Sequence, residues 1–312
     1  MVQNHDRMVP ANAGRAAAAI ERAVECSVTG QVTHPIIIVG PEDLRALDRP
    51  YIREQLDRMM LGEHPDEGLS SLLDTGILDL IFPEVQALVG FGDGEWRHKD
   101  VWKHTRQVVK QSASRLEVRW AALFHDIGKV RTRSVDDSGE VHFFGHAEVG
   151  ARMFDKLERR EGLFSRDAAL RKTVRFLVLH HLRASQYDAR WTDSAVRRFA
   201  RDIGGHMEDL LCLSRADITT KRPEKKRRGV ALIDELSERI SQLAVEDAKQ
   251  PPLPKGVGTE LMQAFKLPPS RLVGEIKRAL EAAVAAGELE PFQEPGYYVE
   301  YVAAHPQRFR LG

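Results

Sequence analysis

The sequence has few cysteines and no long apolar run. Its 312 residues contain only Cys26 and Cys212, which lie far apart and form no Cys-x-x-Cys spacing. This excludes a disulfide framework and a zinc site made of thiolates, and it is typical of a reducing compartment. No apolar run approaches the length of a membrane span, and the run at residues 16–20 is too short for a signal-peptide core. We therefore expect a cytoplasmic protein without a membrane partner.

An excess of charge of either sign is also lacking. Lys+Arg and Asp+Glu both number 46, so binding to nucleic acid would require a local basic patch. The chain also lacks a Gly-x-Ser-x-Gly elbow, a phosphate-binding loop ending in Gly-Lys-Ser/Thr, and a Cys/His pairing. Chemistry that depends on a protein nucleophile is therefore not indicated.

The pattern of apolar residues predicts a mainly α fold, because strand-like alternation is scarce and helical periodicity is frequent. We expect one helix at 16–26, and helices over much of 41–286. The residues from 36 to 39 (IIIV) predict a short strand, although no neighbouring strand is visible. Residues 131–144 predict a β-hairpin, because Asp136-Asp137-Ser138-Gly139 is turn chemistry.

The central stretch is 119–129 (RWAALFHDIGK). It predicts a buried helix whose end carries His125 and Asp126 side by side, and Gly128 suits the left-handed position just past a helix end. Titratable groups at a buried position need partners. A metal ion would satisfy both groups, and a mixed nitrogen and oxygen site favours Mn, Fe, Co, Ni or Zn.

Further residues of this kind fall on other expected helices within about 115 residues. In helical bundles, metal sites are built from ligands that project inward from facing helices. Four residues suffice for one ion, and an accessory pair would supply a second ion with Asp126 bridging. A metal pair about 3.5–4 Å apart can hold a bridging hydroxide and clamp a phosphoryl group. The four are His104, His125, Asp126 and Asp217, and the accessory pair is His146 and His181.

Three residues close in sequence to the candidate ligands have both a functional and a structural interpretation. His180 adjoins His181, but we favour His181 as the ligand because it shares a face with Val174 and Val178. Lys129 either binds phosphate as a point charge or stabilises a helix C-terminus. His142 in the expected hairpin is typical of an exposed residue.

Several phrases resemble the HD superfamily of metal-dependent phosphohydrolases. More narrowly, they resemble the neck, HD domain and tail of bacterial CCA-adding tRNA nucleotidyltransferases of the poly(A) polymerase family. The phrases are 78–84 (LDLIFPE), 119–129, 145–151 (GHAEVGA), 192–198 (TDSAVRR) and 215–221 (RADITTK). The resemblance implies the metal ligands given above and 2′,3′-cyclic phosphodiesterase or phosphatase activity. It implies catalytic roles for Asp126 and Lys129, and substrate contacts by Lys129, Arg183, Lys221 and Arg222.

The resemblance also implies four regions. These are a disordered or relic segment at 1–40, a helical neck at 41–95, an HD domain at 96–222, and a helical tail at 223–312 with a linker near 249–258. Residues 1–40 contain no Gly-Gly-x-x-Arg-Asp stretch, so we expect no nucleotidyltransferase domain and no nucleotide addition. An upstream start that restores this domain is an open alternative.

Two functions follow. The first is a metal-dependent phosphohydrolase, with one or two transition-metal ions, acting on phosphate esters of nucleotides or RNA ends. The alternative is a tRNA-binding protein with a residual HD site. It rests on the basic run 221–228 and on Tyr297, Tyr298 and Tyr301, which could stack on bases or belong to the core. Neck helices without a partner domain would suit a homodimer surface.

Overall fold

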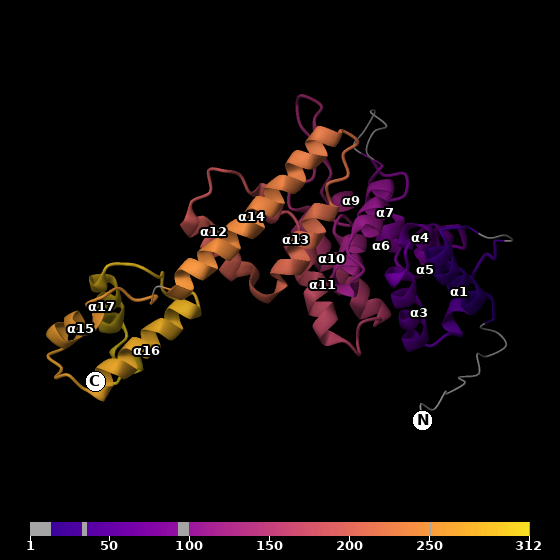
Figure 1. Ribbon diagram of the computed structural model, residues 1–312. Helices are drawn as coiled ribbons and strands as arrows, with labels where there is room; N and C mark the ends of the chain where they lie inside the picture. Colours follow the sequence, from indigo (N-terminus) through magenta and orange to yellow (C-terminus); the bar gives the residue numbers. More distant parts are fainter. Residues whose placement is uncertain (1–13, 33–35, 93–99, 250, 312) are drawn as a thin grey trace. The chain divides into compact units, whose positions relative to one another are not determined.

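A computed structural model of the chain describes residues 14–32, 36–92, 100–249 and 251–311 (Figure 1). Within these ranges the chain is helical apart from its loops and one antiparallel hairpin, formed by β1 (Ser134–Val135) and β2 (Val141–His142). The mainly α class and the hairpin are therefore confirmed. No helix in the same ranges combines the length and the apolar character that crossing a membrane requires.

The chain forms two compact units. The first comprises 1–190 and 203–236, and the second comprises 191–202 and 237–312. Helix α14 (Pro223–Lys249) belongs to the first unit at its start and to the second unit at its end. The divisions expected at 40, 95 and 222 stay predictions.

The first unit begins with short helices. Helix α1 packs against α3 and α4, and it confirms the helix expected at 16–26. The strand expected at 36–39 is wrong, because these residues form no strand and the described residues contain no strand that pairs with them. Only Val39 of this segment is buried, and its N–H donates to the carbonyl of Thr75. The expected disorder before α1 concerns residues 1–13, which lie outside the described residues. The helices are α1 (Gly14–Thr29), α2 (Pro41–Arg45), α3 (Arg49–Leu61), α4 (Pro65–Asp74), α5 (Ile77–Ile81) and α6 (Pro83–Gln86).

The rest of the first unit surrounds helix α8 (Leu116–Phe124), which contacts α3, α7, α11 and α13. Every residue of α8 from Val118 onward is buried. The rings of Trp120 and Phe124 stack along one face of α8, at 5.9 Å and 11°. Large buried rings contribute much of a core's apolar area, so α8 is the centre of this unit. The surrounding helices are α7 (Val101–Gln111), α9 (Lys129–Thr132), α10 (His146–Glu161), α11 (Ala168–His180) and α13 (Met207–Ala216), with 3-10 turns η2 (Ala184–Gln186) and η3 (Gly204–His206).

Arg119 fixes the start of α8 against the end of α3. Its side chain is buried, and its guanidinium donates to the backbone carbonyls of Met60 and Gly62, the latter at 2.7 Å. Burial lowers the pKa of Arg119, because the charged form loses its contact with water. The last carbonyls of a helix lack partners within the helix. A buried arginine that serves them explains this charge in an otherwise apolar stretch.

Gly128 is not left-handed, which corrects the sequence interpretation. Its φ is −67°, and it lies in the right-handed helical region at the start of α9. The reason for glycine here is space. A Cβ atom at this position would overlap the carbonyl oxygen of His146 and would lie 2.7 Å from the backbone nitrogen of Gly150. Gly128 therefore lets the turn after α8 touch the backbone of α10, which brings Asp126 close to His146.

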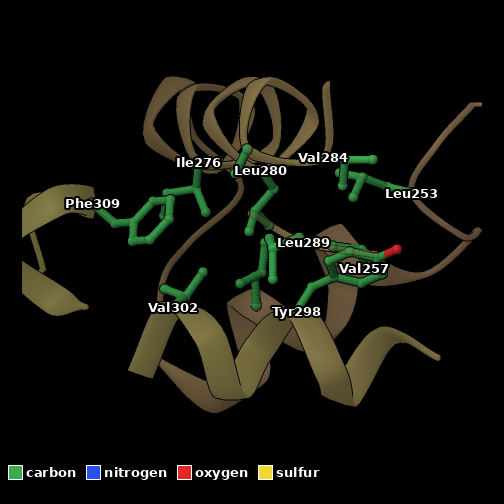
Figure 2. Close-up of a cluster of buried hydrophobic side chains, with 11 residues drawn as sticks. Leu253, Val257, Ile276, Leu280, Val284, Leu289, Tyr298, Val302 and Phe309 are labelled. Carbon is green, nitrogen blue, oxygen red and sulfur yellow. The ribbon is translucent and has the colours of Figure 1, made fainter. Parts of the chain in front are cut away.

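The second unit has its own apolar core. Side chains of α16 (Arg271–Ala285) face those of α17 (Pro295–Ala304) across this core, as Figure 2 shows for Leu280 and Tyr298. Tyr298 is fully buried, and its hydroxyl donates to the carbonyl of Glu290 at 2.9 Å. Tyr298 is therefore a core residue, which excludes it from base stacking. Tyr297 is 37% exposed. The unit also contains α12 (Asp193–Ile203), α15 (Val257–Ala264) and the 3-10 turn η4 (Pro306–Phe309).

The close approach at Gly128 predicts a position-specific cost of adding a methyl group. We expect Gly128→Ala to lower the free energy of unfolding of the first unit by about 1–3 kcal/mol, because backbone atoms must shift to admit the Cβ. Gly205→Ala is the matched control, since a Cβ there meets no atom within 4 Å. Chemical denaturation followed by circular dichroism measures both variants. Equal midpoints for the two variants would contradict this account of Gly128.

Candidate metal centre

The candidate ligands converge mainly at helix ends. His125 caps α8, His181 caps α11 and Asp217 caps α13, while His146 is the first residue of α10. Only His104 lies in the interior of a helix, α7. The sequence predicts His125 and Asp126 at the end of a helix, and this placement is correct. It places His146, His181 and Asp217 on helix faces, whereas these three residues lie at helix ends. Because most of these ligands lie where helices begin or end, five separate elements can meet at one point without distortion of any helix.

The first cluster contains His104, His125, Asp126 and Asp217. The Nε2 atoms of His104 and His125 are 3.2 Å apart. Oδ2 of Asp126 lies 3.4 Å and 3.2 Å from these two atoms, respectively. Oδ1 of Asp217 lies 3.0 Å from Nε2 of His104 and 3.5 Å from Nε2 of His125. Two imidazole nitrogens and two carboxylate oxygens therefore surround one point.

The second cluster contains Asp126, His146 and His181, and their ligand atoms lie within 4.8 Å of one another. The Nε2 atoms of His146 and His181 are 3.1 Å apart, and Oδ1 of Asp126 lies 3.6 Å from Nε2 of His146. Asp126 is shared between the clusters, because its Oδ2 faces the first and its Oδ1 faces the second. Its side chain is 1% exposed, so this carboxylate is enclosed by both groups.

Each histidine is oriented by a contact at its other ring nitrogen. The Nδ1 atoms of His125, His146 and His181 each lie 2.8 Å from a backbone carbonyl oxygen, those of Ala122, Phe143 and Val178 in turn. Because a carbonyl can only accept, Nδ1 carries a proton in these rings, and Nε2 faces the cluster, where it offers a lone pair whenever the ring is neutral. Histidines that bind metals in proteins show this arrangement almost always.

The hydroxyl of Thr219 serves His104 in the same way, since its Oγ1 lies 2.9 Å from Nδ1 of His104. Sequence reasoning missed this residue. Thr219 lies two positions after Asp217 inside the phrase 215–221, so its place in that phrase was the available signal. The contact connects the segment after α13 to helix α7.

Burial and neighbouring charges shift the pKa values of these groups in different directions. Burial opposes a charge on His125, but Asp126 and Asp217 beside it outweigh burial and raise its pKa to about 10. Burial likewise favours the neutral form of Asp126, yet His125, Lys129 and His104 hold its pKa well below the ordinary value. Asp126 is therefore an ionised carboxylate, held at the centre by cations.

In the second cluster, burial outweighs the neighbouring carboxylates in its effect on the pKa of the histidines. Burial, with a contribution from charge on His125, lowers the pKa of His181 to about 4. Burial also lowers the pKa of His146. Both rings are therefore neutral at pH 7, which is the form that binds a metal ion. In the first cluster, hydrogen bonds from His104 and His125 overcome burial and hold the pKa of Asp217 far below its ordinary value.

Lys129 lies beside these ligands, and its Nζ is 2.6 Å from Oδ2 of Asp126. The same ammonium lies 5.6 Å from the centre of the Phe143 ring. Arg183 follows His181 by two residues and is half-buried, whereas Lys221 and Arg222 are exposed in the segment after Asp217. No contact recorded between described residues joins Lys221 or Arg222 to the clusters, so their substrate roles stay predictions.

His180 and His142 lie outside the two clusters. The ring of His180 packs against Phe176 at 4.3 Å between centroids. His142 belongs to an exposed group on the hairpin, with Asp136 and Glu140. That group could hold a cation by distance alone. Both oxygens of Asp136 are already occupied, however, by the backbone and hydroxyl of Ser138, the backbone of Glu140, and His142.

The two buried clusters fit divalent transition metals. Their donors are imidazole nitrogens and carboxylate oxygens, with no thiolate, and this set suits Mn, Fe, Co, Ni or Zn. The nitrogen and oxygen atoms that face one another in each cluster lie 3.0–3.6 Å apart. The other nitrogen of each imidazole already has a hydrogen-bond partner, so the facing atoms are the ones that can bind an ion at the centre of the cluster. A bound cation would satisfy these buried donors together.

Comparison with known proteins gives two family matches. The HD domain matches residues 99–237, which include both clusters, and the "Probable RNA and SrmB- binding site of polymerase A" matches residues 49–88. The second match covers helices α3 to α6 and a few residues beyond.

Curated relatives are tRNA nucleotidyltransferases. The chain is 32% identical over 270 residues to the A-adding tRNA nucleotidyltransferase of Deinococcus radiodurans, which is 83% of this chain and 60% of that protein. It is 31% identical over 269 residues to the CC-adding tRNA nucleotidyltransferase of Thermus thermophilus, covering 84% of this chain and 58% of the relative. A multifunctional CCA protein of Pseudomonas paraeruginosa matches over 39% of this chain. The chain thus spans about 60% of the length of the Deinococcus radiodurans and Thermus thermophilus relatives.

The adjacent histidines His180 and His181 provide a matched test of the second cluster. We expect His181→Ala to lower the amount of bound transition metal below that of the wild type, because Nε2 of His181 faces Nε2 of His146. We expect His180→Ala to bind as much metal as the wild type, since that ring packs against Phe176. Elemental analysis after dialysis against a defined metal buffer measures both. Equal loss in the two variants, or no loss in either, would remove His181 from the site.

Proposed function

Because this chain is an HD-domain protein related to the tRNA nucleotidyltransferases, we propose that it is a metal-dependent phosphohydrolase. Its substrates are phosphate esters of nucleotides or RNA ends, of the 2′,3′-cyclic phosphodiester or phosphomonoester type. The observation that carries this proposal is the pair of donor clusters that share Asp126. We do not extend the nucleotide addition named for the relatives to these 312 residues.

The proposed ligands divide between two cations. His104, His125, Asp126 and Asp217 hold the first, and His146, His181 and the other oxygen of Asp126 hold the second. When bound, such cations polarise phosphoryl oxygens and lower the pKa of the attacking water. The elements of the chain that supply these ligands are held together independently of substrate, by the core around α8 and by the contact at Gly128.

Two residues of the chain have further roles. Asp126 stays ionised, because the cations around it lower its pKa, and so it acts as a shared anionic ligand rather than as a proton donor. Lys129 places an ammonium at the same carboxylate, with 21% of its side chain exposed. An accessible positive charge beside the metal ligands can bind a phosphoryl oxygen and stabilise the negative charge that develops there.

The proposed hydrolase function predicts that substitutions in the buried clusters, and not elsewhere, abolish turnover. We expect Asp126→Asn and His125→Ala to lower kcat toward 2′,3′-cyclic nucleotides by more than about 100-fold, because losing even a group that orients a metal ligand costs roughly 10–100-fold. Asp79→Asn, at an exposed aspartate of α5 outside both clusters, is the control and should keep full activity. The assay uses protein supplied with Mn, Ni or Co. Wild-type turnover by both cluster variants would sink the proposal.

A second function, tRNA or RNA binding, is favoured by the match of residues 49–88 to an RNA-binding family. The basic run 221–228, which continues into the first turns of α14, is its proposed contact. Within this run Lys226 contacts Gln111 and Arg227 contacts Glu224, while Lys221 and Arg222 are exposed. Exposed cations without a fixed protein partner are available for phosphate groups.

This second function predicts binding that weakens steeply with salt. We expect Lys221→Ala and Arg222→Ala together to weaken tRNA binding and to reduce the slope of log affinity against log salt by about 2, at about 1 per lost phosphate contact. Lys172→Ala on α11 removes an exposed lysine elsewhere and serves as the control. Filter binding at several salt concentrations measures the slope. Binding that is absent, or insensitive to salt, would exclude this function.

A further inference from the structure

Phe144 exposes an aromatic ring beside the proposed metal centre. Its exposure is 77%, the largest among the big apolar side chains of the described residues. The ring does not simply extend into solvent, because it stacks on His142 with centroids 4.9 Å apart and an angle of 12° between the planes. One face of Phe144 is therefore covered by a parallel ring, and its high exposure means that the rest of the ring is open.

The ring beneath Phe144 is itself held in place. Nε2 of His142 lies 2.8 Å from Oδ2 of Asp136. The other oxygen of Asp136 accepts from the backbone N–H of Ser138 and of Glu140, each at 2.9 Å, and from the hydroxyl of Ser138 at 2.6 Å. The hairpin turn thus fixes Asp136, Asp136 orients His142, and His142 supports Phe144. This chain of contacts presents a flat aromatic surface at little further cost in entropy.

The stack lies next to the proposed metal ligands along the chain. Phe144 precedes His146 by two residues, which limits the distance between their Cα atoms to about 7 Å. Gly145 lies between them with φ of 72°, so the chain turns there before α10 begins. The carbonyl of Phe143 orients His146 through Nδ1, and the ring of Phe143 lies near Lys129.

Cations precede the hairpin in the chain. Arg131 and Arg133 lie between Lys129 and β1, both are exposed, and neither forms an ion pair with another described residue. The turn of the hairpin carries the carboxylates, Asp136, Asp137 and Glu140. Proteins bind single strands by combining aromatic rings, on which bases stack, with cations that contact the phosphates.

From this juxtaposition of Phe144, His142 and the metal ligand His146, we propose that Phe144 is a stacking site for the nucleobase of the substrate. The base lies on the open face of Phe144 while the phosphate ester lies at the metal centre and Lys129. The inference rests on the proposed phosphohydrolase function and adds to it the residue that selects substrates with a base over phosphate esters without one. Stacking is tolerant of sequence, because every base has a π face.

The test compares two cyclic phosphodiesters that share the same reacting ring. One is a nucleoside 2′,3′-cyclic monophosphate, and the other is glycerol 1,2-cyclic phosphate, which has no base. Loss of one stacked base costs roughly 5- to 150-fold in affinity. We expect Phe144→Ala to raise KM for the nucleotide by such a factor with kcat little changed, and to leave the base-free substrate unaffected. Phe144→Tyr should restore the wild-type KM.

Val135→Ala is the control, because Val135 is an exposed apolar residue of the same hairpin without a ring partner. Equal changes for both substrates in Phe144→Ala would mean a structural effect on the site, and no change for the nucleotide would mean that the base lies elsewhere. Either result overturns the stacking proposal and leaves the hydrolase intact.

A binding measurement separates failure of the stacking site from failure of the hydrolase. In Phe144→Trp the new indole should lose fluorescence as a nucleoside monophosphate is added, because a stacked base quenches it, whereas Val135→Trp should not respond. If the wild type hydrolyses neither substrate, the proposed function fails, and quenching specific to Phe144→Trp still supports a base on this ring. Without any quenching the ring is not a base site.

Discussion

The burial of the Asp126 carboxylate is the constraint on which the first unit depends. An ionised group with 1% of its side chain exposed is stable only among compensating charges, and these come from His125, Lys129 and His104. Each partner arrives from a different element: the C-cap of α8, the start of α9, and α7. The packing of these elements and the chemistry of the site are therefore one problem. A cation that satisfies Asp126 from both sides would be a stabilising component of the fold as well as a source of activity.

The backbone meets this requirement because the ends of several helices lie close together. Helix α8 is buried along its length, so the residues that follow it emerge at the centre of the unit. Gly128 allows the following turn to touch the backbone of α10, and the carbonyls of Ala122, Phe143 and Val178 orient three imidazoles. These carbonyls belong to the helix end or loop that carries each histidine. Local chain geometry thus determines both where each ring lies and which nitrogen faces the centre.

The residue types of the site could be predicted from the sequence because charge in an apolar stretch is a visible anomaly. His125 and Asp126 interrupt a buried run, and the other candidates recur on separate expected helices. The helix-end placement of His125 and Asp126 follows from the end of that run, but that of His146, His181 and Asp217 could not be predicted, since periodicity describes the interior of a helix and not its cap. Gly128 was assigned to a left-handed turn because a close backbone contact leaves no local signal. Thr219 and the orienting carbonyls also depend on tertiary structure.

The same reasoning explains the other differences. The β-branched residues 36–39 have strand propensity, but no neighbouring strand is present to pair with them in the described chain. Tyr298 lies in the core of the second unit, whereas its neighbour Tyr297 is partly exposed, and only the three-dimensional packing of α17 on α16 distinguishes them (Figure 2). The similarity to the A-adding tRNA nucleotidyltransferase covers 83% of this chain and therefore includes parts of both units.

The most direct measurement is an anomalous diffraction map from crystals grown with Mn, Ni or Co and recorded at the absorption edge of the added metal. The account predicts a peak among His104, His125, Asp126 and Asp217, and a second peak among Asp126, His146 and His181 when two ions bind. A map with no peak at either position, or with its only peak at the Asp136 group of the hairpin, would contradict the claim that the fold is built around a metal held by Asp126.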